Sequence, residues 1–262
     1  MSKFEILCVT MHQSDFSKIR EMNIHSNVVF ANQCNHTSYE ELDFDGHTAK
    51  MISTNTRGVG INRNLTLMYA TADICLFADD DVTYRDEMED LVLQEFEEHP
   101  DADVFIFHLE AIDSERKQQK YAKTRKCGPL ERMPWGGIRI AFRRNAVQKA
   151  NVWFTTLFGG GCPFPSGEDS LWLMDAKRAG LRFYVSEYTI GTVSMAESTW
   201  YTGVNEAYYL GRGAFYMAAH PKTRFLWMMY YAWRTRDRAK IDYWKRVRFM
   251  RQGAEDYRNF HG

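Results

Sequence analysis

The segment Ile74-Cys75-Leu76-Phe77-Ala78-Asp79-Asp80-Asp81 decides the expected fold, because it joins an apolar run directly to three carboxylates. Five consecutive apolar residues predict a strand that is buried on both faces of a parallel sheet. The acidic triplet then falls at the carboxyl end of that strand, where open α/β sheets bind their ligands. Three adjacent carboxylates repel one another, so a compensating cation is expected beside them.

The residues around this segment alternate between strand-like and helix-like patterns. Strands are expected at Glu5–Thr10, Val28–Ala31, Lys50–Ser53, Val104–His108 and Ile138–Phe142, and helices at Asp15–Met22, from Gly60 onward, at Arg85–His99 and at Asp169–Ala179. This alternation predicts an α/β fold with a mostly parallel central sheet that helices cover on both sides. The 262 residues allow one such domain with an appendage.

The chemistry of the acidic triplet favours a hard divalent cation. Carboxylate oxygens suit Mn²⁺ or Mg²⁺ better than zinc, and no histidine and cysteine cluster in the sequence competes for the assignment. Such a metal would bridge the two phosphates of a nucleoside diphosphate and neutralise the charge of that leaving group. The alternative interpretation is a solvated acidic turn that caps the next helix.

Composition narrows the function classes and the compartment. The formal net charge is −1, which argues against a general nucleic-acid binder. No apolar stretch approaches the roughly 20 residues that cross a bilayer, and no secretory signal is visible. The five cysteines are scattered and show no CxxC pairing. These features predict a cytoplasmic protein with reduced thiols.

The end of the chain has a different character, so we expect a domain at 1–219 and a helical extension at 220–262. From Pro221 onward, eleven lysines and arginines stand against four acidic residues, and many tryptophans, tyrosines and phenylalanines lie among them. A basic, aromatic helix fits the headgroup zone of an anionic membrane. For a cytoplasmic protein, the extension would then contact the inner face of that membrane. The other open interpretation is a helical layer that packs on the first domain or on a second subunit.

Several short motifs in this order resemble the inverting family-two glycosyltransferases, which have the GT-A fold. They are Asn55-Thr56-Arg57-Gly58, Asn62-Arg63-Asn64, the strand from Asp73 to Asp81, a glycine-rich stretch and Gly167-Glu168-Asp169. The resemblance covers roughly Lys3 to Tyr188. It implies a GT-A, Rossmann-like catalytic domain, which agrees with the α/β pattern described above.

The resemblance also implies roles for the residues that bind the donor. It puts Asp79 and Asp80 near the ribose and the diphosphate, Asp81 on the metal, and Arg57 and Arg63 on the donor. An arginine at a helix N-terminus would attract an anionic phosphate both by its own positive charge and by the helix dipole. The alternative for Arg63 is an ordinary exposed arginine on a helix.

For the transfer step, the resemblance implies that Asp169 is the general base. Such a carboxylate removes the proton of the acceptor hydroxyl as that hydroxyl attacks the anomeric carbon. Glu168 would position the acceptor or orient the base. The alternative is that Ser166 or Asp169 only caps the helix that follows.

The sequence departs from the family pattern at the expected nucleobase pocket and at one metal position. The first strand ends in Thr10-Met11-His12-Gln13 rather than in a proline motif, and the second leads to Asn32-Gln33-Cys34 rather than to Asp-Gly. We expect Thr10, His12, Asn32 and Gln33 to line the pocket. Many relatives have a metal-binding histidine after the base, whereas Thr189–Trp200 contains none. Asp81, phosphates and water would then hold the metal.

The sequence therefore predicts a metal-dependent inverting hexosyltransferase. Its donor would be a nucleotide-diphosphate sugar, UDP-linked, and its acceptor a hydroxyl of a glycan or of a lipid-linked molecule in bacterial surface-polysaccharide synthesis. One alternative is a nucleotidyltransferase, although Met11-His12-Gln13-Ser14-Asp15 is not the glycine-rich basic loop expected there. Another is a membrane-peripheral glycan-binding protein that retains the fold. Oligomerisation stays open.

Overall fold

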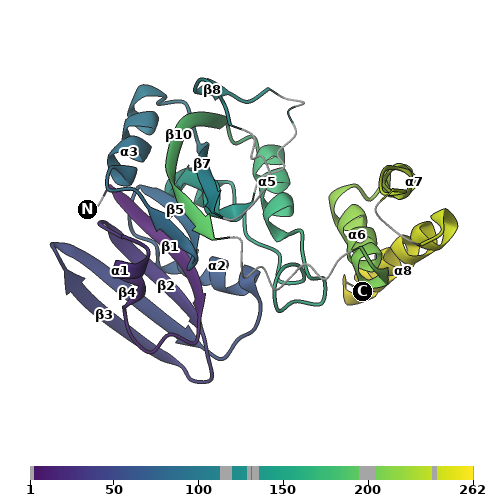
Figure 1. Ribbon diagram of the computed structural model, residues 1–262, viewed down its shortest axis with the longest axis horizontal. Coiled ribbons are helices and arrows are strands. Elements are labelled where there is room, and N and C mark those ends of the chain that lie inside the picture. The colour runs from purple at the N-terminus through teal and green to yellow at the C-terminus, as the bar shows by residue number, and fades with distance from the viewer. Residues whose placement is uncertain are drawn as a thin grey trace.

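The computed structural model describes residues 3–112, 120–128, 131, 136–194, 204–237 and 241–261. Within these ranges, ten strands form one sheet (Figure 1). They are β1 (Phe4–Met11), β2 (Asn27–Gln33), β3 (Ser38–Phe44), β4 (His47–Thr54), β5 (Ile74–Asp79), β6 (Val82–Tyr84), β7 (Val104–Ile112), β8 (Arg125–Lys126), β9 (Ile140–Arg143) and β10 (Phe183–Ser194).

The strand order is β3-β4-β2-β1-β5-β9-β7-β10-β6, with β8 paired to β10. Strands β4, β2, β1 and β5 pair in parallel, as do β7 and β10. Strand β9 lies between β5 and β7 and is antiparallel to both, so these two strands run in the same direction. The edge strands β3 and β6 are antiparallel to their neighbours. The expected mostly parallel central sheet is confirmed.

The helices cover both faces of this sheet. Before the C-terminal region they are α1 (Lys18–Glu21), α2 (Val59–Tyr69), α3 (Met88–Glu98), α4 (Arg144–Lys149) and α5 (Glu168–Arg178), with a short 3-10 helix, η1, at Gly137–Arg139. The core on one face includes residues of α3, whereas the core on the other includes residues of α2, α4 and α5.

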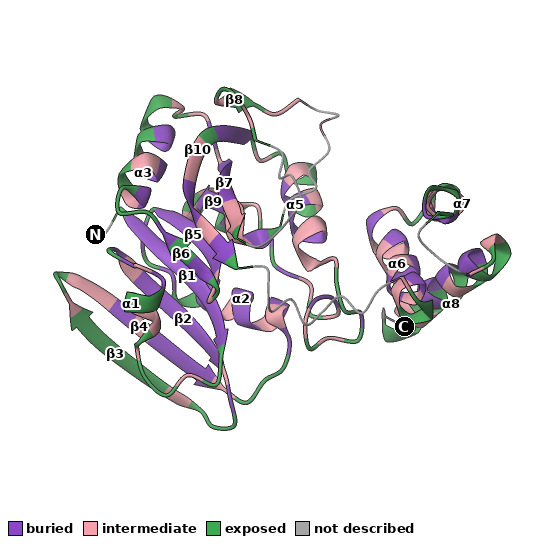
Figure 2. Cartoon of the chain, viewed as in Figure 1, coloured by how far each residue is buried: buried purple, intermediate pink, exposed green. Residues whose placement is uncertain are grey.

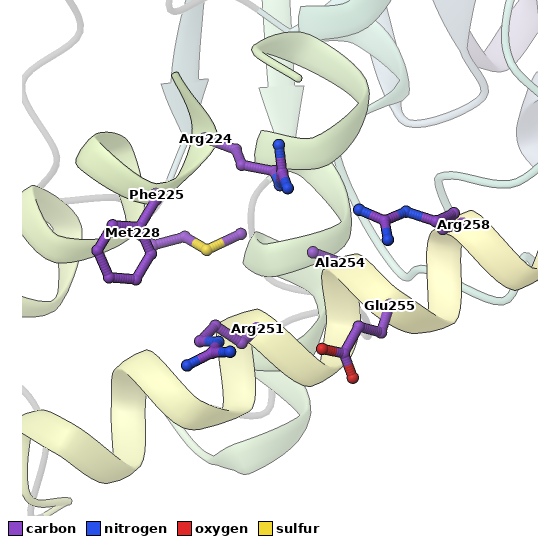
Figure 3. Close-up of a pocket in the computed structure, with 7 residues that line it drawn as sticks. All are labelled: Arg224, Phe225, Met228, Arg251, Ala254, Glu255 and Arg258. Atoms are coloured by element: carbon purple, nitrogen blue, oxygen red, sulfur yellow. The ribbon is translucent and has the colours of Figure 1, made fainter. Parts of the chain in front are cut away.

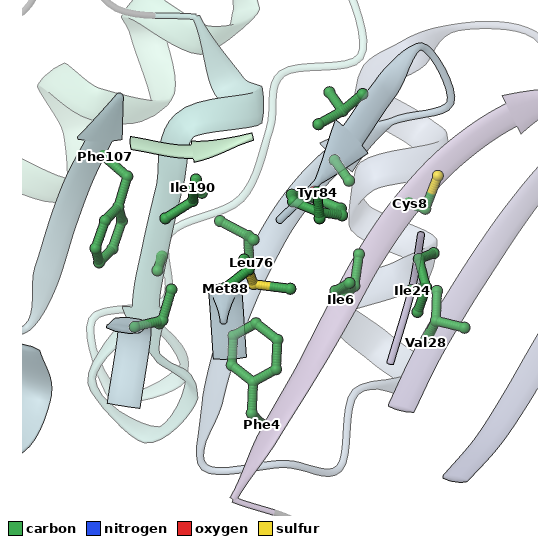
Figure 4. Packing of buried hydrophobic residues seen from close by; sticks show 14 of the residues in the cluster. Phe4, Ile6, Cys8, Ile24, Val28, Leu76, Tyr84, Met88, Phe107 and Ile190 are labelled. Carbon is green, nitrogen blue, oxygen red and sulfur yellow. The ribbon is translucent and has the colours of Figure 1, made fainter. Parts of the chain in front are cut away.

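The alternation of side chains along β1 shows why the sheet needs both layers. Phe4, Ile6 and Cys8 belong to the core on the α3 side, and Leu7 belongs to the other (Figure 4). Successive side chains of a strand point to opposite faces, so an uninterrupted apolar strand requires cover on both. Figure 2 shows the resulting buried centre of the sheet and the exposed strand β3 at its edge.

The expected elements are all present, although several differ in length or type. The helix expected at Asp15–Met22 shortens to the four residues of α1. The strand expected at Ile138–Phe142 begins as η1 and becomes extended only at Ile140. The sequence did not indicate the antiparallel β3 or the long strand β10, in which polar and apolar residues do not alternate regularly.

Three further helices follow the sheet, namely α6 (Glu206–Ala219), α7 (Arg224–Arg234) and α8 (Tyr243–His261). They lie beyond α5 at one end of the molecule (Figure 1). Tyr209, Met228, Val247 and Met250 belong to the core that they share. The boundary expected at residue 220 stays a prediction, and α6, which precedes it, packs with α7 and α8. Within the described ranges, no helix is long and apolar enough to span a bilayer.

Two glycines allow the close contact between α6 and α8. A methyl group on Gly213 would collide with the backbone of Met250, and one on Gly253 would collide with the backbone of Leu210. Close approach of two helix backbones needs a residue without a side chain at the crossing point. A second apolar cluster, which includes Phe158, Leu171 and Ala214, connects these helices to the segment around α5.

Candidate active site

The acidic triplet lies where the sequence predicts it, at the carboxyl end of β5. Ile74–Ala78 is buried, Asp79 ends the strand, and Asp80 and Asp81 form the turn into β6. Because β1 and β5 are parallel neighbours, their carboxyl ends meet at one edge of the sheet. The hydroxyl of Thr10, at the end of β1, donates a hydrogen bond to the carboxylate of Asp80.

The charges of this turn act on Asp81. Desolvation by the surrounding protein, together with the negative charges of Asp79 and Asp80, raises the pKa of Asp81 to about 6. Asp81 is nevertheless exposed as a residue. Lys18 on α1 donates to the backbone oxygen of Asp80 at 3.3 Å. The turn therefore keeps an excess of negative charge that a divalent cation would neutralise.

Arg63 connects the acidic turn to the second half of the chain. Its side chain is only 3% exposed, and its Nη2 lies 3.1 Å from Oδ1 of Asp79. Its Nη1 donates to Oδ1 of Asp169 and lies 3.9 Å from Oε1 of Glu168. The guanidinium carbon lies 5.2 Å from the ring centre of Phe154. A buried guanidinium needs such partners, because an unpaired buried charge is strongly destabilising.

The start of α5 presents the two carboxylates expected to take part in the transfer. Gly167 precedes the helix at φ +124°, a conformation that residues with a side chain rarely adopt. Glu168 and Asp169 then occupy the first turn, where the helix dipole favours negative charge. Oε2 of Glu168 accepts the backbone N–H of Gly167 at 3.0 Å.

Asp169 is held from two sides. Arg63 binds its Oδ1, and the backbone N–H of Gly137 donates to its Oδ2 at 2.7 Å. A Cβ on Gly137 would lie 2.6 Å from Nη1 of Arg63 and 2.7 Å from Oδ1 of Asp169, so a side chain there would displace the end of one or both of these side chains. Each carboxylate oxygen has a second lone pair, which leaves acceptor capacity for a substrate hydroxyl.

The remaining residues of the expected donor site lie together at the ends of β1 and β2, and most of them bind other parts of the chain. The buried amide of Asn32 bonds the backbone of Gln13 and the hydroxyl of Ser53. Oε1 of Gln33 accepts the N–H of Gly58 at 3.0 Å. The backbone N–H of His12 donates to the carbonyl of Gln33, and His12 itself has φ +57°.

Arg57 likewise joins two loops. Its Nη1 donates to the carbonyl of Cys34 at 2.8 Å, and its Nη2 donates to the side chain of Asn35 at 2.9 Å. The side chains of Asn32, Gln33 and Arg57 therefore bind protein groups at the edge where a nucleobase is expected. A direct contact of any of them with a nucleobase stays a prediction.

The fit of a metal to this site rests on the acidic turn. In the part of the chain that the structure describes, no three histidines, cysteines or carboxylates come together as a preformed metal cage. Asp81 is exposed and lies beside the negative charges of Asp79 and Asp80, which suits Mg²⁺ or Mn²⁺ held by one carboxylate and by substrate phosphates. Of the segment Thr189–Trp200, residues 195–200 lie outside the described residues.

Comparison with known proteins agrees with this geometry. The family model described as "Glycosyl transferase family 2" matches residues 36–162, which include the acidic turn. Residues 36–162 are therefore similar to the family 2 glycosyltransferases, and the chain has the GT-A fold. No curated protein sequence matches it.

Solved structures of low sequence identity share the fold. The crystal structure of residues 1–349 of S. aureus TarS matches with a TM-score of 0.61 and 15% identity, over 98% of this chain and 92% of that one. The same TarS fragment in complex with UDP-GlcNAc matches with a TM-score of 0.58 and 17% identity, over 99% and 72% of the two chains.

Sequence reasoning missed two contributors to the site, namely the N–H of Gly137 and the ring of Phe154. The pair Gly136-Gly137 before a strand was a visible signal of close backbone approach, although nothing local indicated Asp169 as its partner. Phe154 carries no local signal, because its place beside Arg63 depends on the packing of distant segments.

Proposed function

We propose that this chain is a metal-dependent, inverting glycosyltransferase that moves a hexose from a UDP-linked donor to a hydroxyl of a glycan or a lipid-linked acceptor. The observation that carries the proposal is the continuous contact Asp79–Arg63–Asp169. It joins the strand end expected to bind the donor to the helix start expected to provide the base. The TarS fragment has been crystallised with UDP and with UDP-GlcNAc, which supports a uridine nucleotide as the donor.

In the proposed transfer, the acceptor hydroxyl attacks the anomeric carbon while the bond to the diphosphate breaks on the opposite face. Asp169 takes the hydroxyl proton, and its two anchors, Arg63 and the N–H of Gly137, fix the carboxylate for that approach. Glu168, on the same helical turn, orients the acceptor or the base. A metal on Asp81 would supply electrostatic stabilisation of the diphosphate leaving group.

The biological setting that we propose is bacterial surface-polysaccharide synthesis on the inner face of the membrane. A lipid-linked acceptor would bring the enzyme to that surface, and the basic, aromatic helices α7 and α8 would contact it. Their exposed apolar side chains include Leu226, Trp233 and Trp244, which support contact with the headgroup zone.

A thermal-shift series tests the donor proposal, with UDP, GDP and their sugars in the presence and absence of Mn²⁺. Ligands that bind only the native state raise the melting temperature by mass action. We expect UDP and UDP-sugars to raise it, more so with Mn²⁺, and Asp81→Asn to remove the metal-dependent part. Equal shifts by GDP, or no shift by any nucleotide, would refute the proposed donor.

A further inference from the structure

A pocket that the transfer reaction does not use lies between α7 and α8 (Figure 3). It has a volume of about 470 Å³, and its walls are Arg224, Phe225, Met228, Arg251, Ala254, Glu255 and Arg258. An adjoining pocket of about 420 Å³ shares Phe225, Arg251 and Glu255 with it and adds Trp244, Val247, Arg248 and Gln252. The two pockets together form one surface with four arginines and one glutamate.

The positive charge on this surface is not neutralised within the protein. Arg248, Arg251 and Arg258 are exposed and make no hydrogen bond or ion pair with any other described residue. Figure 3 shows the guanidinium groups of Arg224 and Arg258 directed toward each other across the space between the helices. Like charges that face one another across an apolar floor favour an anion between them.

The start of α7 adds to this field. The first turn of the helix contains no acidic residue, and Thr223 makes no side-chain capping hydrogen bond. Free backbone N–H groups and the helix dipole at such an N-terminus favour a phosphate or a carboxylate. Arginine binds phosphate oxygens in a bidentate manner, which makes phosphate the better match to this pocket.

The apolar side chains around the pocket decide the kind of phosphate. Trp244 is 66% exposed and Phe225 is 47% exposed, and both line the pockets. Leu226, which follows Phe225 on α7, is 67% exposed. A soluble polyanion would leave these side chains in water, whereas a membrane surface buries them at the boundary of headgroups and acyl chains. The combination of arginines with exposed aromatic residues fits an anionic bilayer.

We propose that the pocket between α7 and α8 binds the phosphate group of an anionic membrane lipid, with Arg224, Arg251 and Arg258 as its ligands and with Phe225 and Trp244 in the headgroup zone. The inference makes the proposed membrane contact specific and is independent of the transfer reaction. It requires that removal of these arginines weakens binding more than an equal loss of charge elsewhere.

The test measures co-sedimentation of the full chain with phosphatidylglycerol vesicles and with phosphatidylcholine vesicles. We expect binding to the anionic vesicles only, and the double variant Arg251→Gln/Arg258→Gln to bind them roughly 30-fold more weakly. The matched control is Arg20→Gln/Lys149→Gln, which removes the same charge from exposed positions on α1 and α4. The control is expected to bind as the unchanged protein does.

Two outcomes would overturn the proposal. One is equal vesicle binding by the pocket variant and the control, and the other is equal binding of the unchanged protein to phosphatidylglycerol and phosphatidylcholine vesicles. A UDP-induced thermal shift of the same variants shows that they are folded. The same measurement separates the two proposals. If UDP does not raise the melting temperature of the unchanged protein, the proposed donor site is refuted, whereas the result for vesicle binding is unaffected.

Discussion

Replacement of Gly137 by alanine tests the geometry of the site with one methyl group. The new Cβ would lie 2.6 Å from Nη1 of Arg63 and 2.7 Å from Oδ1 of Asp169, closer than such atoms pack. One or both side chains must therefore move by several tenths of an ångström or more. Overpacking of this kind costs about 1–3 kcal/mol. For a protein of this size, that loss lowers the melting temperature by about 2–12 °C.

The catalytic effect of Gly137→Ala is expected to exceed its effect on stability. A base displaced by about 1 Å from its productive position loses about 100-fold in rate. The assay is release of nucleoside diphosphate from the donor with acceptor present, at equal fractions of folded protein. Gly136→Ala is the matched control, because its Cβ would meet Asp169 only at an ordinary 3.8 Å and its φ is −79°. Indistinguishable melting temperatures and rates for the two variants would refute the assigned contacts.

Three further predictions follow from individual residues. Asp169→Asn is expected to lower kcat by at least about 100-fold, while UDP still raises the melting temperature. Retained transfer by this variant would exclude Asp169 as the base. In the folded protein the pKa of Asp81 is about 6, raised from its ordinary value of 3.8, so the metal-free protein should lose stability as the pH rises from 4 to 6. Asp81→Asn should reduce that loss in a series of melting curves at different pH values. An unchanged pH dependence of the melting temperature would contradict the assigned pKa. Gly213→Ala is expected to separate α6 from α8 and to make the C-terminal helices sensitive to limited proteolysis. The control is Gly211→Ala, whose new methyl group would meet only Pro165 at 3.6 Å, and it should resist the protease as the unchanged protein does. Equal cleavage of the two variants would contradict the close crossing of the helices.

The environment of Arg63 in the structure differs from the one that the sequence predicts. The sequence predicts an arginine at a helix N-terminus that is available to phosphates, and in the structure its guanidinium is buried between Asp79 and Asp169. Its contact with the donor stays a prediction. The same position lets Arg63 hold the carboxylates of Asp79 and Asp169 in fixed relation, which was not evident from its motif.

Local patterns in the sequence determined the elements that carry the site. The apolar run before Asp79 predicts β5, because a strand buried on both faces is mostly apolar in its interior. Glycine followed by two carboxylates predicts the start of α5, because backbone freedom and the helix dipole act within one turn. These signals depend only on neighbouring residues, and they fixed the α/β fold and the strand-end acidic turn.

The tertiary structure alone decided which of these residues meet. Arg63 and Asp169 are 106 positions apart, and Gly137 approaches Asp169 because β9 is inserted antiparallel between β5 and β7. No local pattern contains that strand order, since it results from the packing of whole strands and helices across the sheet. The sequence by itself therefore determined the acidic strand end, and packing between distant segments determined the buried arginine that joins it to Asp169.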